Sequence, residues 1–506
     1  MPLRAILTAA ALLTPATALA DQHVSPHATP YDMTPLQVFY MSAMGHNVTG
    51  ARRYLKARAH LLDGAGVSIG NYESGYNPFH PELSDANGNP RVIEVGEDSS
   101  QTTAKSDFST DLITCTRLPT NATSDTFNLA RCEDGYSAHG TATLSILGAK
   151  DDGIGVTGIV PKAKLYVSAR LPDTTADQTP DFYAAETNMF DRLIAALPNY
   201  SVLLIEAQTD TGPPNHRFIP KSYDKHLDSA FRRAIQKGIT VVYGAGNGGV
   251  LLDDPTKNDR FDDNQYGLID LYGTVIPVAA ASTGFRSLWI DQQPTFTLAS
   301  SQSKFIPLYS LGENVATAGY ASKNRDTPPD PNCVGQAQIS HFVGAYIWPQ
   351  DACQPWVKRL ENEEENNAYA RFSSNKKRHD VRQYFEAAKT NKDVQKAIAA
   401  APHYYTDSFG GTSSASAIVA GLAASVQGYF QQTQATAKKP GLTGLEIHAV
   451  LLASARKSGR DIRFCAPDML EAVKIIDEGV EPSGVLRSWA AQDIMRDFFD
   501  KKPITC

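Results

Sequence analysis

The chain has 506 residues, 42% of them hydrophobic and 20% charged, as is usual for a globular protein with one large core or two to three ordinary domains. The formal net charge is -7 and no extended basic run occurs, which argues against nucleic acid as the main partner. Beyond the N-terminus no stretch approaches about 18 unbroken apolar residues, so we expect no membrane span.

The first 20 residues have the organisation of a secretory signal peptide. Arg4 supplies the positive charge, Ala5–Leu13 are apolar apart from one threonine, and Ala18–Ala20 has the small-x-small pattern of a cleavage site. A short buried helix is the alternative interpretation. We expect residues 1–20 to be removed during export, which implies a secreted or periplasmic location.

Six cysteines fit an oxidising compartment and support the same location. They fall as three pairs of neighbours, and local disulfide bonds are our preferred pairing among the 15 connectivities that six cysteines allow. No C-x-x-C spacing occurs, which argues against a structural zinc site. The pairs are Cys115 with Cys132, Cys333 with Cys353, and Cys465 with Cys506.

From residue 61 onward, short apolar runs alternate with helical patterns. Strands are expected at 67–69, 164–167, 201–205, 239–243 and 274–280, and helices at 139–148, 182–197 and 223–237. Buried apolar strands that alternate with helices indicate a parallel sheet covered on both faces. The expected fold class is therefore α/β.

The chain is expected to divide into one main domain with two extensions. Residues 61–480 form the main domain, residues 21–60 an N-terminal extension or short propeptide, and residues 481–506 a C-terminal extension. Two segments interrupt the main domain: 84–135 is polar and rich in Gly, Asn, Ser and Thr, and 322–403 contains a proline cluster and a charged helical run. We expect 84–135 to be an insertion that forms a long surface excursion. Since 322–403 lacks enough apolar residues for an independent core, we expect it to be an insertion as well.

His139 stands out among the twelve histidines. It lies in Ser137–Thr143, at the start of an expected helix whose small residues leave room for close packing. A histidine so placed can be the general base that a serine nucleophile requires. It can equally be a helix-capping or surface histidine.

Asn247 follows the apolar run at 241–243, in the glycine-rich turn 244–249. Functional loops of α/β sheets lie at the carboxyl ends of the strands, and an asparagine amide there can donate a hydrogen bond to a developing oxyanion. The alternative is an asparagine in a left-handed turn.

Ser413 lies in the turn Gly410–Ser414, which precedes a run of small residues that suit a helix. A serine at a helix N-terminus is surrounded by free N–H groups and a dipole that favour negative charge, as a nucleophile that creates an oxyanion requires. The alternative is a helix N-cap without chemistry.

Together, these three motifs resemble those of the subtilisin-like serine peptidases. The family has a serine motif Gly-Thr-Ser-x-Ala, a histidine motif His-Gly-Thr and an oxyanion asparagine in Ala-Gly-Asn, which stand here at 411–415, 139–141 and 245–247. The resemblance spans roughly residues 61–480, and the order acid, histidine, serine is that of subtilisin, distinct from the orders in chymotrypsin and in α/β-hydrolases. It implies a three-layer α/β/α fold with a mostly parallel central sheet, with Ser413 as nucleophile, His139 as base and Asn247 in the oxyanion hole.

The expected triad acid departs from the family pattern. The family has an aspartate just after the first core strand, at a fixed distance from a His-Pro-Asp-Leu-like segment, and that distance from His80–Leu83 leads to Glu73. Glutamate serves as the orienting acid in other serine hydrolase triads. Asp63 is the other nearby carboxylate, but it precedes the strand and is expected at its opposite end.

Two further departures concern the neighbourhood of the nucleophile. Ala417 replaces a proline that the family usually has, and the helix should tolerate the change. Glu206 and Gln208 stand where the family has a small segment lining the pocket for the residue before the cut, so we expect both to line the substrate-binding site. Glu206 would favour a basic substrate residue there, unless it is a buried, hydrogen-bonded glutamate.

The expected function is that of a serine endopeptidase that hydrolyses protein or peptide substrates through an acyl-enzyme. A catalytically impaired homologue that binds peptides is the alternative, and a hydrolase of small esters or amides is a third interpretation. No cofactor is required. The family often binds structural calcium, for which the acidic stretch 252–263 is a candidate, although it also fits a solvated loop. The sequence does not indicate the oligomeric state.

Overall fold

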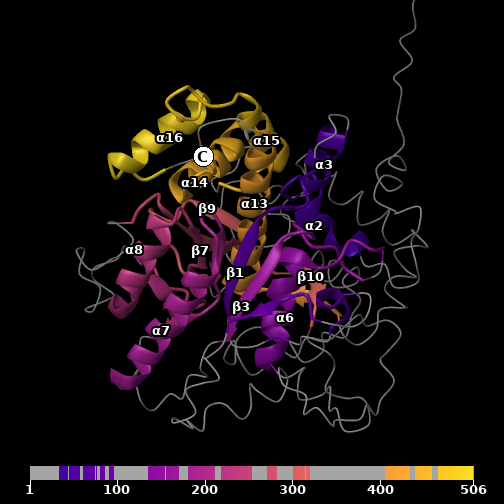
Figure 1. Cartoon of the computed structure of the whole chain (residues 1–506), viewed down its shortest axis with the longest axis vertical. Coiled ribbons are helices and arrows are strands. Elements are labelled where there is room, and N and C mark those ends of the chain that lie inside the picture. The colour runs from indigo at the N-terminus through magenta and orange to yellow at the C-terminus, as the bar shows by residue number, and fades with distance from the viewer. Residues whose placement is uncertain are drawn as a thin grey trace, which may run out of the picture.

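Figure 1 shows the computed structural model of the whole chain. The residues that it describes are 34–43, 45–56, 61–73, 76, 80–85, 90–95, 135–153, 155–169, 180–210, 218–252, 271–281, 300–313, 315–319, 405–433, 439–458 and 465–504. The proposed signal peptide at 1–20, most of the two proposed insertions and the acidic residues from 253 onward lie outside these ranges, as do all cysteines except Cys465. Within the described residues, no helix is long and apolar enough to cross a membrane.

The centre of the fold is a seven-stranded sheet in which every pairing between neighbours is parallel. The strands, in their order across the sheet, are β2 (Ile93–Glu94), β3 (Lys164–Ala169), β1 (Ser68–Glu73), β4 (Val202–Ile205), β7 (Thr240–Gly244), β8 (Val275–Ala281) and β9 (Leu308–Leu311). Central strands such as β4 and β8 are continuously buried, which explains their unbroken apolar sequences.

Two small antiparallel pairs lie outside this sheet. They are β5 (Gln208–Asp210) with β6 (Phe218–Pro220), and β10 (Val315–Ala318) with β11 (Tyr405–Phe409). The helices are α2 (Val38–Met41), α3 (Val48–Lys56), α6 (Gly135–Gly148), α7 (Pro180–Ala196), α8 (Asp228–Gln236), α13 (Gly411–Thr433), α14 (Gly444–Lys457), α15 (Met469–Asp477) and α16 (Trp489–Phe499), with 3₁₀ turns η1 (Thr34–Gln37), η2 (Pro81–Leu83), η3 (Lys221–Tyr223) and η4 (Lys225–Leu227).

Alternation along β1 shows how the two helical layers are divided. Tyr72 points toward α7, where its ring lies 4.1 Å from that of Phe190, centroid to centroid. Asn71 points the other way, and its Nδ2 donates to the Thr143 hydroxyl of α6 at 3.0 Å. Successive strand residues face opposite sides, so Glu73 shares the α6 face with Asn71. Helices α7 and α8 cover one side of the sheet and α6 and α13 the other (Figure 1).

Helix α13 runs through the middle of the fold. All residues from Thr412 to Phe430 are buried, and most have small side chains. At Gly421 an added Cβ would lie 2.9 Å from the Ile159 side chain, so only glycine allows this approach to the neighbouring segment. The helix packs against α6 and against β4, β7, β8 and β9, which fixes its N-terminus relative to the carboxyl ends of those strands.

The expected α/β fold with three layers and a mostly parallel sheet is confirmed. One predicted helix, at 223–237, is wrong in its first part, since α8 begins only at Asp228. Asp224 is extended (φ -80°, ψ 97°), and its carboxylate is 2.5 Å from the ammonium group of Lys221. This ion pair holds the chain in two short 3₁₀ turns where the apolar spacing alone predicted a continuous helix.

Both extensions pack against the main domain. At the N-terminus, the Tyr40 hydroxyl donates to the Ala316 carbonyl at 2.9 Å, and Tyr40 is fully buried. At the C-terminus, the Phe498 ring of α16 lies 4.9 Å from the Tyr272 ring and 4.6 Å from the His448 ring. The described parts of residues 21–60 and 481–506 therefore belong to the same hydrophobic core as residues 61–480.

Candidate active site

Three neighbouring strands place polar side chains at one edge of the sheet. Glu73 ends β1, Glu206 directly follows β4, and Asn247 lies three residues after β7. Because β1, β4 and β7 are parallel neighbours, these residues emerge at the same carboxyl edge, where α/β proteins bind their ligands. The N-terminus of α13, with Ser413 in its first turn, lies at this edge too.

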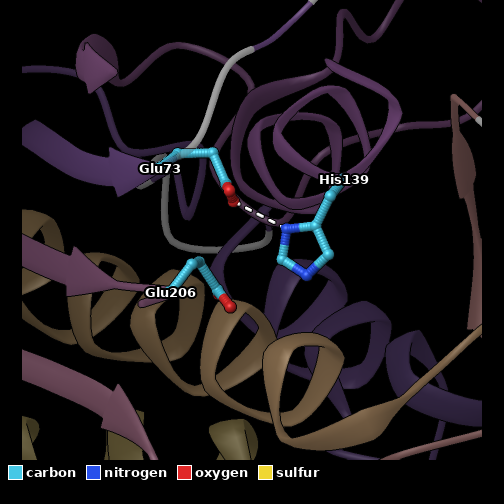
Figure 2. A group of neighbouring side chains, drawn as sticks. All are labelled: Glu73, His139 and Glu206. Atoms are coloured by element: carbon cyan, nitrogen blue, oxygen red, sulfur yellow. Dashed lines mark hydrogen bonds and ion pairs between the residues drawn. The ribbon is translucent and has the colours of Figure 1, made fainter. Parts of the chain in front are cut away.

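Glu73 and His139 form a direct contact. The imidazole Nδ1 lies 2.8 Å from Glu73 Oε2, and this contact is the dashed line in Figure 2. Glu73 is 2% exposed and the His139 side chain 25%, so the carboxylate is enclosed while the imidazole reaches the surface of the site. With Nδ1–H donating to the carboxylate, Nε2 is the nitrogen that can accept a proton.

A hydrogen-bonded relay supports Glu73 from the α6 face. Asn71 Nδ2 donates to Thr143 Oγ1 at 3.0 Å, and Thr143 Oγ1 lies 3.4 Å from Glu73 Oε2 and 3.1 Å from the Gly140 carbonyl. Thr143 follows His139 by four residues and therefore lies on the same helix face. That spacing from His139 is the sequence signal for Thr143, which the three motifs by themselves do not indicate.

Electrostatics couples His139 to two carboxyl groups. Burial lowers the pKa of His139, but the charge of Glu73, its hydrogen bond and the charge of Glu206 together raise it to about 9. Burial also raises the pKa of Glu206 to about 8, while His139 and hydrogen bonds from Ser413 and Ser416 oppose this effect. Figure 2 shows the carboxyl groups of Glu73 and Glu206 both pointing toward the imidazole ring.

The side chain of Asn247 is oriented by the segment that carries the serine. Its Oδ1 accepts hydrogen bonds from the backbone N–H of Thr412 at 2.8 Å and from the Thr412 hydroxyl at 3.1 Å. Since Oδ1 is engaged in this way, the amide Nδ2 is the group that can donate to an oxyanion beside Ser413. The first-turn N–H of Ser413 can be a second donor, because helix-initial N–H groups lack intrahelical acceptors.

The turn before Ser413 requires glycine. Gly411 has a φ of +78°, and an added Cβ there would lie 3.1 Å from Asn247 Oδ1. Gly244, at the end of β7, is equally confined, since its Cβ would lie 2.8 Å from Thr412 Oγ1. The Gly-Thr-Ser pattern therefore allows Asn247 and Thr412 to approach each other closely.

Gln208 supports the asparagine turn from the side. Its Oε1 accepts the backbone N–H of Asn247 at 2.6 Å, and it begins strand β5. Glu206 is only 7% exposed, and its Oε1 lies 3.2 Å from Ser416 Oγ. The expected role of both residues in substrate binding stays a prediction. Gln208 contacts the backbone of Asn247, and Glu206 contacts the hydroxyl groups of Ser413 and Ser416.

Two groups of side chains in the described residues have the spacing of metal ligands. One is Glu73, His139 and Glu206, which is the site above. The other is Glu186, Asp224 and His226, but the Lys221 ammonium lies between its acids, 2.9 Å from Glu186 and 2.5 Å from Asp224. Because lysine already neutralises these carboxylates, the second group fits a buried ion network better than a calcium site.

Comparison with known proteins identifies the family. A model of the subtilase family matches residues 64–466, so the chain belongs to the subtilase family. It is accordingly a serine peptidase that acts on proteins or peptides without an organic cofactor.

Asp63 lies at the opposite end of β1 from this site, as expected, and its carboxylate is 2.8 Å from the Lys162 ammonium.

Solved structures of similar fold include a protease from Pseudoalteromonas arctica (16% identity over 87% of this chain and 96% of that one, TM-score 0.44). Another is a lanthipeptide protease (15% identity over 87% of this chain and 95% of that one, TM-score 0.45). A third is a cold-adapted subtilisin-like serine proteinase (15% identity over 78% of this chain and 83% of that one, TM-score 0.38). No curated protein sequence matches the chain.

Proposed function

We propose that this subtilase is a secreted or periplasmic serine endopeptidase with Ser413 as nucleophile, His139 as general base and Glu73 as orienting acid. The observation that carries the proposal is the 2.8 Å contact between Glu73 and His139, at the sheet edge where α13 begins and has Ser413 in its first turn. A buried carboxylate that holds one imidazole nitrogen leaves the other available as a base, which is the arrangement that serine nucleophiles require.

The chemistry follows from this arrangement. Ser413 Oγ attacks the substrate carbonyl and transfers its proton to His139 Nε2, while Glu73 holds Nδ1–H and stabilises the imidazolium. The oxyanion accepts hydrogen bonds from Asn247 Nδ2 and from the Ser413 N–H. His139 then returns the proton to the leaving amine, and water hydrolyses the acyl-enzyme by the same steps in reverse.

Export is supported by the sequence pattern of residues 1–20 and by Cys465. Cys465 is buried and disulfide-bonded, as expected of a protein in an oxidising compartment. Its expected partner, Cys506, lies outside the described residues, so the local pairing remains part of the proposal. Structural calcium also remains a proposal, and equilibrium dialysis with ⁴⁵Ca²⁺ would measure it.

A catalytically impaired homologue is not favoured, because the contacts of Glu73, His139 and Asn247 are all compatible with catalysis. The deciding experiment treats the purified protein with a fluorophosphonate probe and maps the label. We expect labelling at Ser413, its loss in Ser413→Ala, and cleavage of a denatured protein into internal fragments. Folded protein that takes up no label would contradict the serine mechanism. Hydrolysis of simple esters without any protein cleavage would instead favour a small-molecule hydrolase.

A further inference from the structure

Glu206 is a second buried carboxyl group beside the catalytic histidine, and the triad mechanism does not use it. Ligand atoms of Glu73, His139 and Glu206 all lie within 4.8 Å of one another. Glu206 directly follows β4 and is 7% exposed, so water does not screen it as it would screen a surface carboxylate. Two carboxylates and one imidazole in this space cannot all ionise independently.

The hydrogen bonds and the burial of Glu206 act in opposite directions on its protonation. Ser416 Oγ donates most closely to the Thr412 carbonyl, at 2.7 Å, one turn back along α13. The same hydroxyl also donates to Glu206 Oε1 at 3.2 Å, and this longer contact has to share its single hydrogen with the Thr412 carbonyl. Burial is the largest effect on Glu206 and raises its pKa to about 8, toward the protonated form, while the hydrogen bonds from Ser413 and Ser416 only partly oppose it.

The charges around Glu206 come from two other elements. Glu73 on β1 and His139 on α6 act on it electrostatically, whereas α13 presents the uncharged hydroxyl groups of Ser413 and Ser416. An ionised Glu206 would stabilise the imidazolium form of His139 and would accept the Ser413 hydroxyl hydrogen. A protonated Glu206 removes that charge, so His139 loses its proton more readily and the Ser413 hydroxyl stays available for attack.

We propose that Glu206 shares a proton with His139 and is thereby a positioning residue that sets the pH range in which His139 is a free base. The proposal rests on the function proposed above, since it concerns the same histidine. It differs from a role for Glu206 as a fixed negative charge that selects basic substrate residues. Glu206 would act through His139 and Ser413, by its charge state.

The test measures the proton on His139 directly. Protein labelled with ¹⁵N-histidine is titrated by NMR, with the His139 signal identified by its loss in His139→Gln. Removing a neighbouring negative charge lowers the pKa of an imidazole, so we expect the His139 midpoint to fall by about one pH unit in Glu206→Gln. Glu206→Ser removes the same charge and is measured alongside, so the result does not depend on one variant folding. Glu206→Asp restores the carboxyl group and should return the midpoint toward the wild-type value.

Glu481→Gln is the matched control, because it removes an exposed carboxylate far along the chain in the turn before α16. We expect its His139 midpoint to equal that of the wild type. The acid limb of kcat/KM should shift in parallel with the NMR midpoint. An unchanged His139 midpoint in both Glu206→Gln and Glu206→Ser would overturn the proposal. A shifted midpoint in a protein without peptidase activity would support the shared proton and contradict the endopeptidase function, so the two failures are distinct.

Discussion

Asn247 Oδ1 accepts the backbone N–H of Thr412 at 2.8 Å, although the two residues are 165 positions apart in the chain. This contact joins the turn after β7 to the first turn of α13. It turns the amide so that Nδ2, and not Oδ1, is available beside Ser413. The hydrogen bond therefore fixes which end of the asparagine side chain can meet an oxyanion.

The first prediction follows from this orientation. Asn247→Ala should lower kcat by about 10²–10³ with little change in KM, because the lost donor acts on the oxyanion of the transition state. Thr412→Val is the control, since it removes the hydroxyl contact and leaves the backbone N–H bonded to Asn247. We expect it to cost about tenfold or less. A higher KM at unchanged kcat in Asn247→Ala would instead place the residue in ground-state binding.

The second prediction concerns the acid behind His139. Glu73→Gln should lower kcat by roughly 10⁴, the order found when an orienting carboxylate is made neutral in another serine peptidase triad. Glu73→Asp retains the charge but is shorter by one methylene group, so it should lose less activity than Glu73→Gln. Steady-state kinetics gives kcat, and circular dichroism checks that both variants are folded. Near-normal activity of Glu73→Gln would remove Glu73 from the triad.

Local patterns in the sequence were sufficient to predict the places of Asn247 and Ser413, because one lies in a glycine-rich turn after a strand and the other at the start of a helix. Glu73 was predicted only through the resemblance to the family, since the expected strand ended at residue 69 whereas β1 continues to Glu73. The sequence could not show that Glu206 contacts Ser416, since that contact depends on how α13 crosses β4. Until its surroundings are known, a glutamate in that position can be interpreted equally well as a charge in the substrate pocket or as a buried, hydrogen-bonded side chain.

Polar contacts also explain the error in the helix predicted at 223–237. The turns η3 and η4 replace the start of a predicted helix because Lys221 reaches both Asp224 and the buried Glu186 of α7. Glu186 in turn accepts the Tyr72 hydroxyl at 3.0 Å, one residue before Glu73. Such a network involves segments that are far apart in the sequence, such as Tyr72 and Glu186 at a separation of 114 residues, so hydrophobic spacing carries no sign of it.

The third prediction concerns acid stability. His448 in α14 is fully buried, and burial lowers its pKa to about 3, although a hydrogen bond to the Gly273 carbonyl partly opposes this. Its pKa in the folded state is thus below the ordinary value near 6.5. Between these two values the unfolded chain binds the proton more readily, so the free energy of unfolding falls as the pH falls below about 6.5.

At pH 5 this histidine alone should cost about 2 kcal/mol relative to pH 7, at roughly 1.4 kcal/mol per pH unit. Urea unfolding of the wild type and of His448→Gln at both pH values measures the effect. The variant should lose less stability between pH 7 and pH 5, by up to that amount. The constant cost of the substitution cancels in this difference. An equal loss in both proteins would show that His448 is not the acid-sensitive group.

The last prediction concerns the N-terminal segment, which the sequence left open as an extension or a short propeptide. Its described part is joined to the domain by specific hydrogen bonds. Gln37 Nε2 donates to the Thr157 carbonyl and Gln37 Oε1 accepts the Thr157 N–H, both at 2.9 Å. The two ring nitrogens of His46 contact the Pro467 carbonyl at 2.9 Å and Ser310 Oγ at 2.8 Å.

Excision near residue 60 would therefore remove Gln37 and His46 and leave their buried hydrogen-bond partners in the domain unsatisfied, at about 1–3 kcal/mol for each group. We expect the mature protein to retain residues 34–56, which N-terminal sequencing of the purified enzyme checks. Deletion of residues 21–56 should abolish folding or lower the melting temperature sharply, whereas deletion of residues 21–33 retains every one of these contacts and is the matched control. A mature N-terminus near residue 60 in an active, stable enzyme would show that the segment is a removable propeptide after all.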